Sequence, residues 1–135
     1  MKKYKIFLLG ISLLVLLSGC SVQKVNTEKI RDIEFTVLEE EKVPEEFLKV
    51  IRKKQQEPFK LTYADEKYLY IADGYGEMKS GGYSVSVDRC FETANAVYIH
   101  TNLLGPSKEE TKGEKKTCPY VVIKLEFIDK NVVFE

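Results

Sequence analysis

The pattern of apolar and polar positions divides the chain into one helical segment and a series of short strands. Residues 30–38 alternate, with Ile33, Phe35 and Val37 on one face and mostly acidic or hydroxyl side chains on the other, which predicts a half-buried strand. In residues 44–56 the apolar side chains recur at helical spacing. This segment opens on a proline and two glutamates and ends in lysines, so it predicts a helix.

Beyond this helix the alternation has the period of β-strands. Strand-like runs cover residues 59–64, 68–72, 83–91, 97–103, 120–128 and 132–134. In the third run, Val85, Val87 and Phe91 fall on one face. This order favours an α+β fold, in which an N-terminal strand and a helix pack on a mostly antiparallel, twisted sheet or small barrel of about six or seven strands. A pure β-sandwich is the alternative.

The first twenty residues have the order of an export signal. Lysines near the start precede an apolar run at residues 6–17, and small residues then lead to Cys20. The run is shorter than the roughly 20 residues that span a bilayer. Residues 17–20 are similar to the bacterial lipobox, in which the cysteine receives a diacylglycerol and cleavage follows just before it. We therefore expect a lipoprotein, anchored by acyl chains to the cell membrane and facing the extracytoplasmic side.

This interpretation divides the chain into three parts. Residues 1–19 are the expected signal peptide, residues 20–29 are the lipidated cysteine with its tether, and residues 30–135 are one globular domain. The signal peptide contains three of the 21 basic residues and none of the 21 acidic ones, so the mature chain has a net charge of −3. A slightly acidic domain without a basic stripe argues against a nucleic-acid partner.

No group of residues predicts an enzyme. His100 is the only histidine, which argues against a histidine-based metal site and leaves a Ser-His-Asp arrangement resting on this residue alone. The glycine-rich segment 73–82 leads into a strand rather than a helix and lacks the spacing of a P-loop. We expect no catalytic residue, no cofactor and no metal.

Cys90 and Cys118 form a candidate disulfide, because we expect the chain to be exported. By parity both cysteines lie on the polar face of their strands. In a simple meander the two strands run parallel, which separates the cysteines by about seven residues, or roughly 20 Å. A disulfide needs Cα atoms within about 7 Å of each other. A bridge therefore requires a strand order other than a meander.

Four segments, residues 68–74, 79–87, 102–107 and 118–124, together resemble the C-terminal domain of the PrcB family. The resemblance rests on the Gly-Gly-Tyr and Pro-Tyr stretches that open two strands, which here are Gly81, Gly82, Tyr83, Pro119 and Tyr120. Ser80 stands where threonine is usual, and Cys118 stands where serine, threonine or tyrosine is less surprising. The family's named member is a lipoprotein subunit of a surface protease complex.

The resemblance implies a membrane-anchored, non-catalytic accessory or assembly module that binds a protein, with an exported protease as one candidate partner. We expect the partner-binding residues to be Tyr75, Lys79, Ser80, Gly81, Gly82, Tyr83, Pro119 and Tyr120. Glycines let another backbone approach, and tyrosines offer amphipathic contact surface.

Three alternatives stay open at this point. The first is that Tyr83 belongs to the core and the glycines merely turn the chain, so that neither contributes to a binding site. The second is that the whole protein is a cell-surface structural or ligand-binding lipoprotein. The long hydrophilic segment at residues 105–117 is either functional or a solvated loop.

Overall fold

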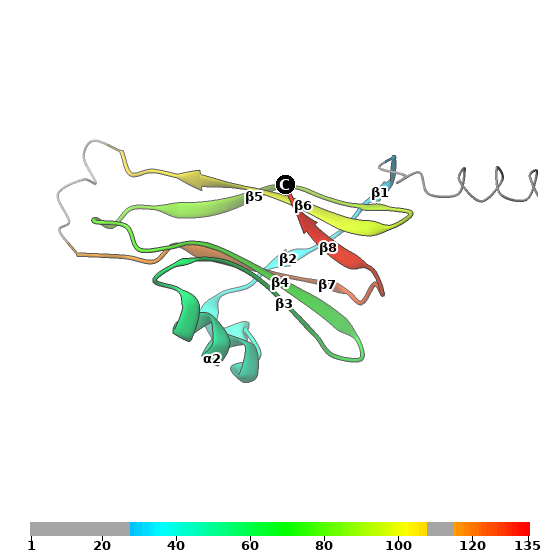
Figure 1. Ribbon diagram of the computed structural model, residues 1–135, viewed down its shortest axis with the longest axis horizontal. Coiled ribbons are helices and arrows are strands. Elements are labelled where there is room, and N and C mark those ends of the chain that lie inside the picture. The colour runs from blue at the N-terminus through cyan, green and yellow to red at the C-terminus, as the bar shows by residue number, and fades with distance from the viewer. Residues whose placement is uncertain (1–27, 108–114) are drawn as a thin grey trace, which may run out of the picture.

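Two four-stranded sheets pack face to face, and one helix covers the outer side of the second sheet (Figure 1). The computed structural model describes residues 28–107 and 115–135. The strands are β1 (Lys29–Asp32), β2 (Thr36–Val37), β3 (Pro58–Ala64), β4 (Tyr68–Tyr75), β5 (Ser84–Thr93), β6 (Ala96–Leu104), β7 (Tyr120–Glu126) and β8 (Asn131–Phe134). The helical elements are the short 3₁₀ turn η2 (Glu40–Lys42) and the helix α2 (Glu45–Lys54).

Sheet A has the strand order β1-β5-β6-β8, and sheet B has the order β2-β7-β4-β3. All neighbouring strands are antiparallel except β6 and β8, which are parallel. The tight turns β3–β4, β5–β6 and β7–β8 lie at one end of the molecule, which we call the hairpin end. The β4–β5 connection and the described residues that follow β6 and precede β7 lie at the other end, which we call the loop end (Figure 1).

This arrangement confirms the α+β class, with a strand and a helix at the N-terminal side. The eight strands form two sheets that do not close into a barrel. The simple meander is wrong, because β7 returns to pair with β4 instead of following β6. Pairing β7 between β2 and β4 buries its apolar inner face against sheet A, which a position at the edge of sheet A would not allow.

Two apolar layers hold the elements together. The first lies between the sheets and consists of Ile33, Leu69, Ile71, Cys90, Val97, Ile99, Val121, Ile123 and Leu125. The second lies between α2 and the outer face of sheet B. There Phe47 and Ile51 from the helix are 2% and 0% exposed and pack against Tyr70, Ala72 and Val122. Strands β4 and β7 are therefore apolar on both faces, as expected for strands buried on both sides.

The predicted N-terminal strand at residues 30–38 is two strands. The first, β1, pairs with β5 in sheet A, and β2 pairs with β7 in sheet B. Ile33 lies at the crossing, where its amide donates to the carbonyl of Cys90 at 2.9 Å, and its side chain enters the core between the sheets. Val37 is 57% exposed, so the predicted apolar face ends at the crossing.

A β-bulge in β5 changes the face on which its later residues lie. Val87 pairs with Thr101 and Arg89 with His100, so Asp88 is the extra residue. A one-residue shift turns every later side chain to the other face. Cys90 therefore lies in the core, and Phe91 lies on the outer face, contrary to the predicted grouping of Phe91 with Val85 and Val87.

The structure holds Cys90 and Cys118 as free thiols, so the candidate disulfide is not formed. Cys90 points into the core near the hairpin end of β5, whereas Cys118 precedes β7 at the loop end. Burial raises the pKa of the Cys90 thiol to about 11, so it stays protonated at neutral pH.

Candidate functional site

The loop end brings the glycine-rich loop and the residues before β7 together. The backbones of Met78 and Thr117 form a two-way bridge, with N···O distances of 2.7 and 3.1 Å. The Thr117 hydroxyl also donates to the carbonyl of Ser80 at 2.8 Å, and Lys116 forms an ion pair with Glu77 at 3.3 Å. Two segments distant in sequence therefore form one surface, on which Ser80 lies beside Thr117.

The positions near this surface differ in whether the structure requires glycine. Gly82 has φ +86°, a conformation that L side chains rarely adopt. Gly74 lies under the ring of Phe59, where a Cβ atom would come within 2.1 Å of Phe59 Cε1. Gly81 has neither constraint, because its nearest neighbour would be Thr117 Cγ2 at 3.9 Å. Gly82 is thus explained by the turn, and Gly81 is the glycine that leaves open surface.

The side chains of the four aromatic and proline residues of the predicted site do not form one surface. The Tyr75 hydroxyl contacts Thr101 between the sheets, and Tyr120 packs against Phe59 under α2 at a ring distance of 6.2 Å. Pro119 is buried, and its carbonyl accepts from the amide of Tyr75 at 3.1 Å. Tyr83 is partly buried.

The predicted site therefore divides into two parts. Residues 79–82 lie on the loop surface, with Lys79 and Gly82 exposed. The contacts of Tyr75, Pro119 and Tyr120 stabilise the fold. Whether residues 79–82 bind a partner stays a prediction.

Tyr75 belongs to a buried polar chain. The Thr101 hydroxyl donates to Asp73 Oδ2 at 2.8 Å, and the Tyr75 hydroxyl lies 2.6 Å from Thr101 Oγ1. Because Thr101 has one hydroxyl proton and gives it to Asp73, Tyr75 is the donor in the second contact. Burial raises the pKa of Asp73, while the hydrogen bond from Thr101 and the charge of Lys60 oppose that shift.

A second surface, which the sequence patterns did not predict, lies on the outer face of sheet A. Phe91, Tyr98 and Val133 pair directly across β5, β6 and β8, and we call them the outer row. The rings of Phe91 and Tyr98 stack with centroids 5.2 Å apart and planes within 4°. Val133 is 38% exposed, and Ile30 on the adjacent edge strand β1 is 61% exposed. The sequence alternation alone assigned Phe91 to the inner face, because it did not reveal the bulge at Asp88.

His100 and Asp88 lie on the same outer face, beside the outer row. His100 Nδ1 lies 2.5 Å from Asp88 Oδ1, and this hydrogen bond lowers the pKa of Asp88. The Arg89 guanidinium in the same strand pairs with Glu135 at 3.4 Å. The outer row therefore has a charged and polar border, which is the usual arrangement around an apolar contact patch.

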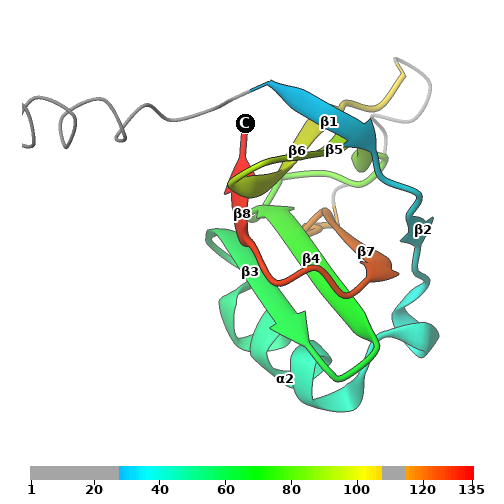
Figure 2. The same ribbon diagram turned by 90° about the vertical axis from the view of Figure 1, so that its right-hand side faces the viewer.

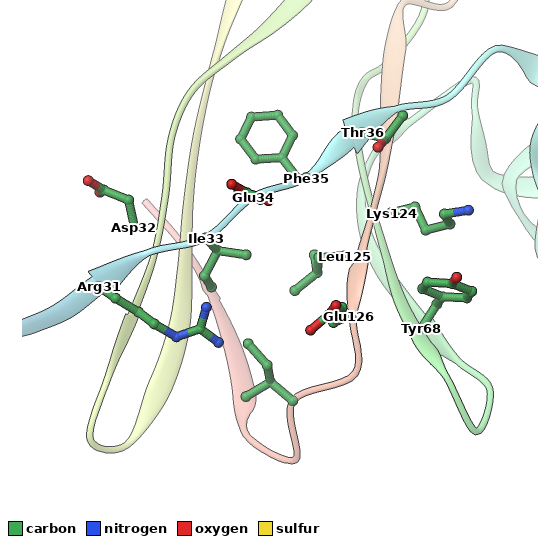
Figure 3. A pocket seen from close by; sticks show the side chains of 11 residues that line it. Arg31, Asp32, Ile33, Glu34, Phe35, Thr36, Tyr68, Lys124, Leu125 and Glu126 are labelled. Atoms are coloured by element: carbon green, nitrogen blue, oxygen red, sulfur yellow. The ribbon is translucent and has the colours of Figure 1, made fainter.

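A groove of about 750 Å³ lies where the chain crosses from sheet A to sheet B. Figure 3 shows Ile33 and Leu125 on its two sides, with Arg31 and Lys124 at opposite rims. Phe35 and Tyr68 also line it. An apolar floor with a charged rim suits a ligand that has both characters.

The basic groups at the rim of this groove are already engaged. Arg31 Nε donates to Glu92 Oε1 at 2.7 Å, and Lys130 holds the other oxygen of Glu92 at 2.6 Å. These contacts, that of Lys130 first, lower the pKa of Glu92. Lys124 Nζ lies 4.4 Å from the centroid of the Tyr68 ring. No group of three or more His, Cys, Asp or Glu side chains suited to a metal ion occurs within residues 28–107 and 115–135.

Comparison with known families gives a match in the middle of the chain. Residues 69–126 match the family model described as PrcB C-terminal. This finding confirms the resemblance drawn from the sequence motifs. The match runs from β4 to β7 and so contains the two central strands of each sheet, whereas all four edge strands and α2 lie outside it. No curated protein and no solved structure gives a significant match.

The predicted lipidation site lies outside the described residues, because Cys20 precedes residue 28. Within the described part of the chain, no helix is both long and apolar enough to cross a membrane.

Proposed function

We propose that this chain is a lipid-anchored, non-catalytic accessory protein that binds another exported protein through the outer face of sheet A, with an exported protease as the first candidate partner. The match to the PrcB C-terminal family supports an accessory role. The outer row carries the proposal, because stacked aromatic side chains beside exposed aliphatic ones and a polar border are typical of protein interfaces.

A pair of matched valines tests this surface. Val133 and Val50 are 38% and 40% exposed, but Val133 belongs to the outer row and Val50 lies on α2 at the other side of the molecule. We expect Val133→Glu to reduce recovery of the partner at least tenfold when the tagged full chain is purified from crosslinked cells in detergent. Val50→Glu should recover the partner normally, and both variants should unfold at the wild-type temperature.

Two outcomes contradict the proposed surface. One is equal recovery of the partner with Val133→Glu and the wild type, and the other is equal loss with both valine variants. The loop surface has its own variant, Gly81→Trp, at a position where an added Cβ atom would meet Thr117 Cγ2 at 3.9 Å, which is ordinary contact. If Gly81→Trp alone loses the partner, the binding site is the loop end instead.

The anchor is tested separately. Cys20→Ser should abolish labelling by an alkyne fatty acid and release the protein from the membrane fraction, because two acyl chains give stable anchoring. Cys118→Ser, which alters a partly buried free thiol, should leave both readouts unchanged. Acylation of the Cys20→Ser protein would rule out the proposed anchor.

A second candidate function is that of a surface lipoprotein that binds a small solute, and the groove between the sheets supports it. A solute that fills the groove should raise the unfolding temperature of the full chain. Thr36→Trp at the rim should remove that increase, and Val37→Trp, outside the groove, should not. A panel of cell-wall fragments that never shifts the unfolding temperature would leave this candidate without support.

A further inference from the structure

Strand β3 is an edge strand with half of its backbone directed to the open side. It is the last strand of sheet B beside β4, and α2 lies on the outer face of that sheet (Figure 2). The amide of Asp65 donates to the carbonyl of Tyr68 at 3.0 Å, so these two residues form a hydrogen-bonded pair. Every second residue of β3 counted back from Asp65 then bonds to β4, and the residues between them do not. The backbone groups of Lys60, Thr62 and Ala64 therefore face away from β4. These groups can pair with one further extended strand.

A groove lies beside this edge, between the end of α2 and β3. It measures about 420 Å³, and Phe59 and Leu61 contribute apolar surface to it. Three of its lining residues are the exposed lysines Lys53, Lys54 and Lys60. An incoming strand would place alternate side chains on the two faces of sheet B. Lys53 and Lys54 come from the helix on the outer face, and Lys60 points to the inner face, near Phe134.

The charges of these lysines are not neutralised by ion pairs, although Asp73 lies opposite Lys60 in the β3–β4 ladder and is influenced by its charge. Other basic residues of α2 are paired: Lys49 with Glu45 and Arg52 with Glu40. Within the described residues, no carboxylate lies within ion-pair distance of Lys53, Lys54 or Lys60. The only acidic residue lining the groove is Glu57. The groove is therefore basic, in a mature chain whose expected net charge is negative.

The same lysines exclude several occupants. An inward-facing lysine on an edge strand discourages pairing with an apolar strand, because its charge would be buried without a partner. A second copy of β3 would bring a second set of the same lysines to this edge, and like charges oppose such pairing. An acidic strand has neither penalty, because its carboxylates would neutralise the lysines on both faces.

We propose that the β3 edge binds an extended acidic segment of a partner protein as an added strand, with its carboxylates paired to Lys53, Lys54 and Lys60. This is the β-augmentation mode, in which backbone hydrogen bonds supply affinity and side-chain contacts supply selectivity. The inference rests on the proposed protein-binding role and names the chemistry of a segment that would be recognised. Because each face of the sheet carries lysine, the segment should have neighbouring acidic residues, one for each face.

The test uses the full chain in detergent and the synthetic peptide Thr-Glu-Glu-Thr-Glu-Glu-Thr. We expect binding that weakens with added salt, together with slower hydrogen exchange at the amides of Lys60, Thr62 and Ala64. Lys60→Glu should weaken the affinity at least tenfold. Lys67→Glu is the matched control, because Lys67 is an exposed lysine in the β3–β4 turn outside the groove. It should change the affinity less than twofold.

Thr62→Pro separates strand addition from simple attraction of charges. It removes an amide that faces the open side, so no bond to β4 is lost, and proline is tolerated on edge strands. Strand addition predicts that Thr62→Pro weakens peptide binding at least tenfold while the protein stays folded. Unchanged binding of Thr62→Pro overturns the inference, as does an equal effect of Lys60→Glu and Lys67→Glu, or equal affinity for the peptide with lysine in place of glutamate.

Val133→Glu distinguishes this inference from the proposed function. It should leave peptide affinity unchanged, because the outer row and the β3 edge belong to different sheets. Peptide binding that persists when no partner is recovered from cells would count against the proposed function only. Failure of the peptide assays beside normal recovery of a partner would overturn only the inference about β3.

Discussion

The two sheets differ in what lies over their outer faces. On sheet B, α2 covers Tyr70, Ala72 and Val122, and all three are buried. On sheet A, the outer row has no covering element among the described residues, although two of its members are aromatic. Apolar side chains on sheet B are explained by the helix that folds over them. Those on sheet A are only partly buried, since Phe91 and Tyr98 have intermediate exposure and Val133 is 38% exposed, which is why we interpret them as contact surface.

The largest expected effect concerns the covered face. Ile51 is fully buried between α2 and sheet B, so Ile51→Ala should lower the free energy of unfolding by about 3 kcal/mol. Its neighbour Val50 is 40% exposed, and Val50→Ala should change stability by no more than about 0.5 kcal/mol. Urea unfolding followed by circular dichroism measures both. Similar values for the two variants would mean that α2 does not cover sheet B as described.

A smaller loss of stability is expected on the outer face of sheet A, which we call the bare face because no described element covers it. Phe91→Ala and Tyr98→Ala should each cost about 1 kcal/mol, and a double-mutant cycle should give a coupling of about 1 kcal/mol from their stacked rings. The double variant should fold and yet lose the partner. A cost near that of Ile51→Ala would show that the outer row is needed for folding, and the contrast between the two faces would then fail.

The smallest effects concern two aspartates and depend on pH. Asp73 lies buried between the sheets with a raised pKa, and Asp88 lies on the bare face with a pKa lowered by its hydrogen bond with His100. The carboxylate of Asp73 therefore costs stability at neutral pH, so Asp73→Asn should raise the unfolding temperature at pH 7. That gain should shrink as the pH falls through the raised pKa and vanish below 3.8, the ordinary value.

Asp88→Asn should have the opposite sign. The lowered pKa means that the carboxylate of Asp88 contributes stability above 3.8, and this contribution disappears as the pH falls through the folded-state pKa. The variant should therefore unfold at a lower temperature than the wild type at pH 7 and at an equal temperature in strong acid. Thermal unfolding from pH 2.5 to pH 7 checks both aspartates, and changes of the same sign would contradict their assigned environments.

Much of the fold follows from local periodicity. The segments 59–64 and 68–72 with their Asp-Glu-Lys turn form the hairpin β3–β4, and residues 44–56 form α2. These elements are local, and their apolar side chains repeat at the period of a single conformation. The division of residues 30–38 between two sheets was not predictable in the same way. Both β1 and β2 are extended, and only their partners, β5 and β7, distinguish them.

The candidate sites were less predictable than the fold. The motifs around Gly81 and Pro119 lie in the segment that matches the PrcB C-terminal family model, and the structure brings the chain near them together through the Met78–Thr117 bridge. Yet Tyr120 packs in the apolar layer under α2. The sequence of β7 did not predict this, because the position of the helix decides that the outer face of β7 is covered. The outer row was missed because one bulge at Asp88 moves Phe91 to the opposite face.

The sequence by itself determined the type of most elements, the motifs that resemble the PrcB C-terminal family and the expectation of an anchor at Cys20. These properties depend on neighbouring residues, and neighbouring residues are fixed by the covalent chain. The tertiary structure decided the order of strands in the two sheets, the inward position of Cys90 and the bare face that carries Phe91 and Tyr98. Those properties depend on pairing between distant strands, where a shift of one residue exchanges the buried and exposed faces.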